Sequence, residues 1–187
     1  MKSKRLFVLS ATALALVSIG NMAWADGGCS SASLRGSYAF SAVGEVIGIL
    51  DDVGVHPFKT PSVLNDVAIV RFDGVSHFSR TDFGTINGVP KTPDFNSDQS
   101  GDYTVNANCT GTMTIRYTSG VVLDLMMVIA DNGTVVKAVI GTETVPASTP
   151  ALDGTTCGTS CKQAVRVSFD GKKVFDARDR DWRTGSQ

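Results

Sequence analysis

No apolar run in this 187-residue chain is long enough to cross a bilayer as a helix, which takes about 20 residues. The apolar run at 6–19 is shorter, and no later stretch is both long and uncharged. Basic residues at 2–5 precede that run, and Ala23 and Ala25 follow it, as in a cleavable signal peptide. We therefore expect residues 1–25 to be removed, no membrane insertion, and a periplasmic or secreted protein. The alternative is a retained membrane anchor.

The chain also lacks an excess of basic charge. Removal of residues 1–25 takes away three basic residues and changes the formal net charge from −1 to −4. Proteins that bind nucleic acid usually present a basic face, so we do not expect nucleic acid as a partner. The remaining residues suffice for one domain with a hydrophobic core.

Common catalytic motifs are missing as well. The sequence contains no Gly-x-Ser-x-Gly, no phosphate-binding loop and no dinucleotide fingerprint. It has only two histidines, His56 and His77, and its cysteines form no Cys-x-x-Cys motif. We therefore predict neither a metal site nor a cofactor.

The four cysteines all lie in the expected mature chain. An even number in an exported protein predicts two disulfides, for which three pairings are possible. We favour a bond between Cys157 and Cys161, which are close in sequence within a loop of Gly, Thr and Ser. That pairing leaves Cys29 with Cys109.

No convincing amphipathic helix follows residue 25. Short alternating or β-branched segments occur instead, separated by turns of the Asp-Gly, Asn-Gly and Ser-Gly kind that suit tight hairpins. The predicted strands cover residues 36–47, 64–72, 75–82, 101–105, 112–118, 121–130, 134–145 and 162–169. Their tight connections predict antiparallel neighbours.

The predicted architecture is therefore all-β, an antiparallel up-and-down barrel of about eight strands over residues 26–175. Residues 50–61 and 146–160 carry proline, glycine and polar side chains, and we interpret both as long loops. Charges alternate over residues 176–187, which predicts a flexible tail.

Two motifs begin at Cys29 and Gly101. They are Cys29-x4-Leu34-x-Gly36-x-Tyr38-x-Phe40 and Gly101-x-Tyr103-Thr104-Val105-Asn106-x-x-Cys109-x-Gly111-Thr112. Together they resemble motifs of small exported bacterial proteins, mostly uncharacterised, whose fold is similar to the lipocalin and allene-oxide-cyclase barrels. The resemblance implies a lipocalin-like barrel and supports the Cys29–Cys109 pairing, but it implies no catalytic residues.

Hairpin pairing across Asp73-Gly74 predicts which side chains face the lumen. A two-residue turn places Val70 opposite His77, with Phe72 on the same face. That face is uncharged, whereas the opposite face carries Arg80. We therefore predict that His77 points into the lumen as an acid–base or hydrogen-bonding group. The alternative is a core histidine whose partner is a neighbouring polar group.

Asp124 interrupts an apolar segment, and its two flanking hairpins disagree about its direction. Across the following turn it shares a face with Lys137 and Glu143, as on an outer surface. Across the preceding turn it shares a face with Tyr117, as in a lumen. The conflict indicates a β-bulge or a wrong register. An inward Asp124 would be a candidate catalytic carboxylate, and an outward one only a surface charge.

These patterns predict a barrel that binds a small hydrophobic molecule in its lumen. The alternatives are a cofactor-independent lyase or isomerase acting on a small substrate such as an epoxide, and a structural protein with a filled lumen. The candidate catalytic residues are His77 and Asp124. The candidate ligand-binding residues are Tyr38, Phe40, Val70, Phe72 and Tyr117.

Overall fold

The computed structural model describes residues 28–174, in which nine strands form one antiparallel sheet. The strand order is β2-β1-β9-β8-β7-β6-β5-β3-β4, and a further pairing of β2 with β3 closes the barrel. The elements are η1 (Ser31–Leu34), β1 (Gly36–Leu50), β2 (Val55–Phe72), β3 (His77–Ile86), β4 (Val89–Pro90), β5 (Asn96–Val105), β6 (Thr110–Arg116), β7 (Val122–Ala130), η2 (Asp131–Gly133), β8 (Val135–Val145) and β9 (Cys161–Lys173).

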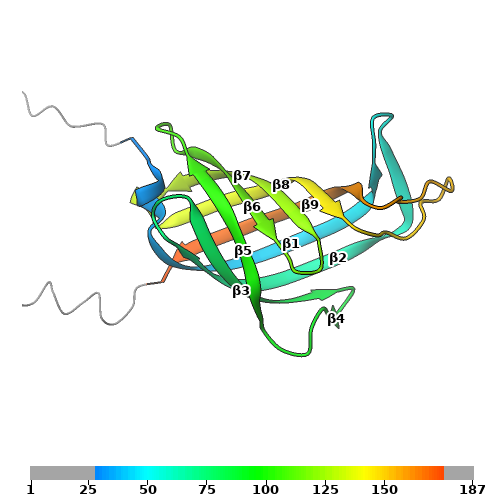
Figure 1. Cartoon of the computed structure of the whole chain (residues 1–187), viewed down its shortest axis with the longest axis horizontal. Coiled ribbons are helices and arrows are strands. Elements are labelled where there is room, and N and C mark those ends of the chain that lie inside the picture. Colours follow the sequence, from blue (N-terminus) through cyan, green and yellow to red (C-terminus); the bar gives the residue numbers. More distant parts are fainter. Residues whose placement is uncertain (1–27, 175–187) are drawn as a thin grey trace, which may run out of the picture.

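Eight of these strands make the closed barrel, and the two-residue β4 pairs only with the end of β3 (Figure 1). Successive barrel strands are neighbours in the sheet, and β9 returns to pair with β1. The predicted all-β, antiparallel up-and-down barrel of eight strands is therefore confirmed. Each predicted strand corresponds to one strand of the barrel.

The long loop predicted over residues 50–61 is wrong. A short turn joins β1 to β2, and β2 is already extended from Val55. Its first half pairs with β1 only, because its pairing with β3 begins at Leu64. Pro57 and Pro61 therefore lie on an edge strand, where a missing backbone N–H is tolerated. Residues 146–160 contain no strand, as predicted.

Aromatic side chains fill the barrel at the end that holds η1 and η2, on the left in Figure 1. Leu34 of η1 is completely buried there. The Phe72 ring makes edge-on contacts with Tyr38 and Tyr103, at centroid distances of 5.4 and 4.9 Å. This end of the lumen is a packed core, and any space for a ligand must lie toward the other end.

Both predicted disulfides are present. Cys29 is bonded to Cys109, which ties the segment before η1 to the β5–β6 turn, and Cys157 is bonded to Cys161. Two disulfides are compatible with an oxidising, extracellular compartment. The predicted signal peptide (1–25) and the predicted tail (176–187) lie outside the described residues. No helix within residues 28–174 is long and apolar enough to traverse a membrane.

Candidate functional site

A cavity of about 140 Å³ lies in the barrel, on the side away from the aromatic core. Its wall is mostly apolar, and its polar side chains come from five different strands and loops. The lining residues are Ala42, Leu64, Asp66, Arg80, Ile86, Lys91, Tyr117, Ser119, Val121, Leu123, Ile140, Glu143, Val167 and Phe169. Ile86 and Ser119 are exposed, so the cavity reaches the surface beside the β3–β4 and β6–β7 turns.

The β2–β3 connection decides which side chains enter the lumen. The Asp73 side chain accepts hydrogen bonds from the backbone N–H groups of Val75, Ser76 and His77, and stabilises a loop longer than two residues. As a result Phe72 pairs with Phe78, and Val70 pairs with Arg80. The predicted register is off by three residues, and a shift by an odd number exchanges the two faces of β3.

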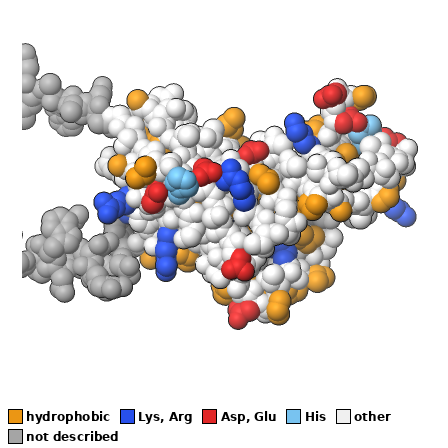
Figure 2. Space-filling view, in the orientation of Figure 1, with side chains coloured by type: hydrophobic (Ala, Val, Ile, Leu, Met, Phe, Trp, Pro, Cys, Tyr) orange, Lys and Arg blue, Asp and Glu red, His pale blue; other side chains and the backbone are white. Residues whose placement is uncertain are grey.

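The orientation predicted for His77 is therefore wrong. Its side chain is 71% exposed and contacts Asp102 on the outside of the barrel, with Nε2 3.2 Å from the carboxylate. Its Nδ1 lies 2.8 Å from the hydroxyl of Ser76. Histidine atoms are visible at the molecular surface beside acidic groups in Figure 2. His77 has no contact with the lumen.

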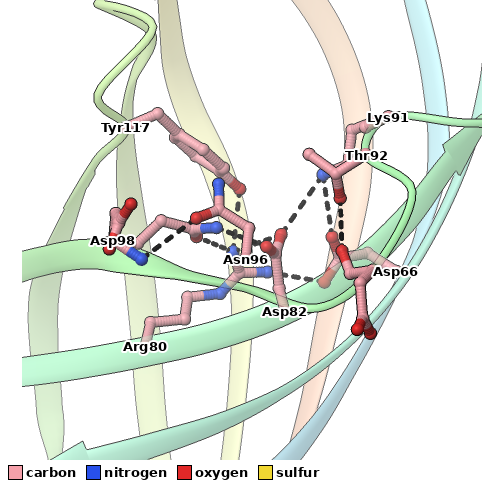
Figure 3. Close-up of polar contacts among 10 residues, drawn as sticks. Asp66, Arg80, Asp82, Lys91, Thr92, Asn96, Asp98 and Tyr117 are labelled. Carbon is pink, nitrogen blue, oxygen red and sulfur yellow. Dashed lines mark hydrogen bonds and ion pairs between the residues drawn. The ribbon is translucent and has the colours of Figure 1, made fainter.

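Arg80 takes the inward position instead, as the centre of a buried polar cluster (Figure 3). Its Nη2 donates to Asp66 Oδ1 at 2.5 Å, and its Nη1 donates to Asp82 Oδ2 at 2.6 Å. The same Nη1 donates to Gln99 and, at 3.0 Å, to the hydroxyl of Tyr117. The lumen predicted to be uncharged therefore contains a buried guanidinium held by two carboxylates.

Lys91 closes one side of this cluster from outside the barrel strands. Lys91 follows β4. The β3–β4 hairpin folds this residue back, so that its backbone N–H donates to the backbone carbonyl of Gly84. Its Nζ lies 2.9 Å from Asp66 Oδ2 and 3.2 Å from Asp82 Oδ2. The ammonium also lies 5.5 Å from the centre of the Tyr117 ring, a cation–π contact. Two cations thus share two carboxylates.

Burial controls the protonation of these groups. Desolvation raises the pKa of Asp66 to about 6, against the attraction of Arg80 and Lys91. Burial also acts to raise the pKa of Asp82. The contacts of this carboxyl with Asp66, Arg80 and Lys91 outweigh the effect of burial, so that the pKa of Asp82 is lowered. Asp66 is therefore the carboxyl of this pair that takes up a proton first as the pH falls.

A β-bulge in β8 brings Glu143 into the cavity. Asp124 pairs with Thr142 and Leu125 pairs with Ile140, which leaves Gly141 without a partner. The extra residue reverses the alternation of β8, so that Ile140 and Glu143 both line the lumen. Burial raises the pKa of Glu143, and the charge of Lys91 opposes this shift only in part.

Asp124 itself is exposed on the outer face of β7, where it accepts a hydrogen bond of 2.7 Å from Thr114. The inward orientation considered for it is wrong, because the register predicted across Ser119-Gly120 is off by one residue and Asp124 pairs with Thr114. A β-bulge is also present, in β8 at Gly141, but it is not the cause of the disagreement between the two hairpins. The extra residue lies in β8, between the pairs Leu125–Ile140 and Asp124–Thr142, and the alternation of β7 is unchanged. For this reason it reorients Glu143 and leaves Asp124 outside.

The five candidate ligand-binding residues all lie inside the barrel, but only one lines the cavity. Tyr38, Phe40, Val70 and Phe72 are buried in the packed core at the other end. Tyr117 lines the cavity with its ring and places its hydroxyl against Arg80. The sequence identified the inward face of β1 and β2, but it did not show where along that face the packing ends.

His56 lies in a second polar cluster, on the β1–β2 hairpin at the far end of the molecule. Its Nδ1 is 2.6 Å from Asp153 and its Nε2 is 2.9 Å from Asp51, so the imidazole joins the hairpin to the 146–160 segment. Hydrogen bonds to Asp153 and then Asp51 raise the pKa of His56, and the bond with His56 lowers the pKa of Asp153 to about 2. The cluster lies outside the cavity.

We expect the His56 cluster to stabilise the protein most at mildly acidic pH. Because folding raises the pKa of His56, the protonated imidazole stabilises the folded state. This stabilisation is fully present below the ordinary pKa of 6.5 and is lost as the pH rises through the folded-state pKa. The lowered pKa of Asp153 stabilises above its ordinary value of 3.8 and is lost as the pH falls toward 2. His56→Gln should therefore lower the melting temperature more at pH 5 than at pH 9. Equal losses at the two pH values would contradict this assignment.

Fold and site together define a closed antiparallel β-barrel with a packed aromatic end and, toward the other end, a mostly apolar cavity that one buried polar cluster borders. No protein-family model matches the chain, and no match was found among curated proteins. Within residues 28–174, no group of three or more His, Cys, Asp or Glu side chains is arranged to hold a metal ion. The cavity is the feature of this barrel from which we infer a function.

Proposed function

We propose that this barrel binds a small, largely apolar molecule in its lumen cavity. The observation that carries the proposal is the cavity itself, about 140 Å³ in volume, walled by Leu64, Leu123 and Phe169 among others, and open to the surface. An apolar cavity of about 150 Å³ is large enough to bind benzene. Few polar groups in a mostly apolar wall are typical of small-molecule sites.

The buried cluster gives this cavity a rigid polar wall. Arg80, Asp66 and Asp82 are almost completely buried and are held in place by mutual hydrogen bonds. Such a wall orients a ligand, because its donors and acceptors are fixed before the ligand enters. This arrangement favours a binding site over the structural alternative, in which the lumen would be filled.

Two alanines on opposite faces of β1 provide a matched test. Ala42 is buried and lines the cavity, whereas Ala39 is exposed on the outer face. Ala42→Phe places a ring where the ligand would lie, so we expect affinity for benzene, measured by calorimetry, to fall about 10-fold or more. Ala39→Phe should leave the affinity unchanged.

Equal benzene affinities in the two variants would contradict the proposed site, as would a wild-type protein that binds no benzene. Overpacking at Ala42 can destabilise the fold, so the melting temperature of each variant is measured in parallel. Ile140→Phe, at a half-buried position on the cavity wall, serves where Ala42→Phe does not fold.

A second candidate is a cofactor-independent lyase or isomerase, and the position of Glu143 favours it. Burial raises the pKa of this carboxyl in the same cavity as the Tyr117 hydroxyl, and a proton donor with a raised pKa suits acid–base chemistry. Incubation with a small epoxide separates the two functions. An enzyme converts the epoxide to product, whereas a binding protein releases it unchanged.

The proposed location is the periplasm or the extracellular space. The two disulfides support it, because such bonds persist in oxidising compartments. The signal-peptide pattern of residues 1–25 supports it independently. We propose on the same basis, and from the eight-stranded barrel, that the protein is similar to the lipocalin type of ligand carrier.

A further inference from the structure

Glu143 differs from the other carboxyl groups of the lumen in having no partner. Asp66 and Asp82 each accept hydrogen bonds from Arg80 and Lys91. Among the described residues, the Glu143 carboxylate forms no ion pair or hydrogen bond. It nevertheless lies on the wall of a mostly apolar cavity, where its charged form is poorly solvated. Its position is set by the bulge at Gly141, which directs it inward.

The charges of the lumen do not balance without a further cation. Arg80 and Lys91 carry two positive charges, and Asp66 and Asp82 match them with two negative charges at distances of 2.5–3.2 Å. Glu143 adds a third negative charge to the same cavity. With all five groups ionised, the lumen has one surplus negative charge. The cavity is therefore complementary to a ligand with one positive charge.

Lys91 does not serve as the partner of Glu143. Its charge acts on the Glu143 carboxyl, but its ammonium is held by Asp66 and Asp82 and lies over the Tyr117 ring. Moving it to Glu143 would leave two buried carboxylates with Arg80 alone, which costs more than it gains. Glu143 thus remains available for a cationic group that enters with the ligand.

We propose that the ligand is a small apolar amine whose ammonium group binds the Glu143 carboxylate while its apolar body fills the cavity. This proposal rests on the proposed binding function and specifies the chemistry of its ligand. An ammonium donates a charge-assisted hydrogen bond, which is roughly twice as strong as a neutral one. A neutral molecule of the same shape leaves the carboxylate without a counter-charge, and an anion adds repulsion.

Three benzene derivatives of similar size test the proposal by calorimetry at pH 8: benzylamine, benzyl alcohol and benzoate. The wild-type protein should bind benzylamine about 10-fold or more tightly than benzyl alcohol, and benzoate most weakly. Glu143→Gln keeps the shape of the side chain and removes its charge, and should abolish the preference for the amine. Asp124→Asn removes a carboxylate from the outer face of the adjacent strand β7 and should preserve the preference.

The outcomes separate this proposal from the binding function on which it rests. Benzyl alcohol that binds as tightly as benzylamine, or an amine preference that survives in Glu143→Gln, would overturn the proposal and leave the binding site intact. Failure of all three compounds and of benzene to bind would overturn both. Glu143→Ala replaces Glu143→Gln where the latter does not fold, and the same loss of preference is expected.

Discussion

Replacing Arg80 with methionine should destabilise the protein by about 3–5 kcal/mol, because it leaves Asp66 and Asp82 buried with one cation between them. Methionine retains much of the apolar volume of the arginine side chain. The loss of stability is therefore caused mainly by the uncompensated buried charge and only to a small extent by a cavity. Urea unfolding at pH 8 measures it. The matched control is Arg116→Met, which breaks an ion pair with Asp102 on the outer face. Because Arg116 is 52% exposed, that loss should stay below about 1 kcal/mol.

The loss in Arg80→Met should also depend on pH. The pKa of Asp66 is already about 6, above its ordinary value of 3.8, and removal of Arg80 raises it further. A carboxyl whose pKa is raised on folding destabilises the protein increasingly as the pH rises toward the folded-state value. The difference between wild type and Arg80→Met should therefore be larger at pH 8 than at pH 5. A loss under 1 kcal/mol, or a larger loss at pH 5, would contradict a buried, ionised cluster.

The two disulfides should contribute unequally to stability. Cys29 and Cys109 are 80 residues apart, whereas Cys157 and Cys161 are four residues apart. The loop-entropy relation then gives about 4.5 kcal/mol for the long bond and about 2 kcal/mol for the short one. The double variant Cys29→Ser, Cys109→Ser should therefore unfold at much lower urea concentration than the double variant Cys157→Ser, Cys161→Ser.

The location of the long bond strengthens this expectation. It fixes the segment that leads into η1, whose Leu34 is completely buried in the aromatic end of the barrel. Equal destabilisation of the two double variants would contradict the view that the Cys29–Cys109 bond holds this end closed.

The barrel could be predicted from sequence because the patterns that identify each strand and each turn lie within a few consecutive residues. Alternation of polar and apolar residues along β6, with Thr112 and Thr114 on one face and Met113 and Ile115 on the buried face, identifies a strand and its inner face without knowledge of its neighbours. Turns such as Asn87-Gly88 mark where strands end, since Asn87 and Gly88 both adopt positive φ. Eight segments of this kind, joined by short turns, suffice to indicate an antiparallel barrel.

The site could not be predicted in the same way, because it depends on two departures from regular pairing. The Asp73 side chain stabilises a longer loop than a two-residue turn, and this brings Arg80 inside in place of His77. The bulge at Gly141 brings Glu143 inside. The disagreement between the hairpins beside Asp124 reflected a wrong register between β6 and β7, and it did not indicate the bulge in β8.

No pattern in the sequence indicates that Lys91 lies close to Asp66 and Asp82. This proximity depends on the way the β3–β4 hairpin folds back. This fold brings Lys91 against Asp82, which is 9 positions earlier in the chain, and against Asp66, which is 25 positions earlier. The cavity is likewise a result of packing. The inward residues of β1 fill the lumen at Tyr38 and Phe40 and leave space at Ala42, a difference of side-chain size at successive inward positions.

The most direct test of the central claim is to locate a small apolar molecule in the barrel by methyl NMR. On titration with benzene, we predict chemical-shift changes at the cavity methyl groups of Leu64, Leu123 and Ile140. The methyl groups of Val128 and Val139, exposed on the outer face, should not shift. Changes confined to the outer methyl groups, or no change at saturating benzene, would contradict a ligand-binding lumen.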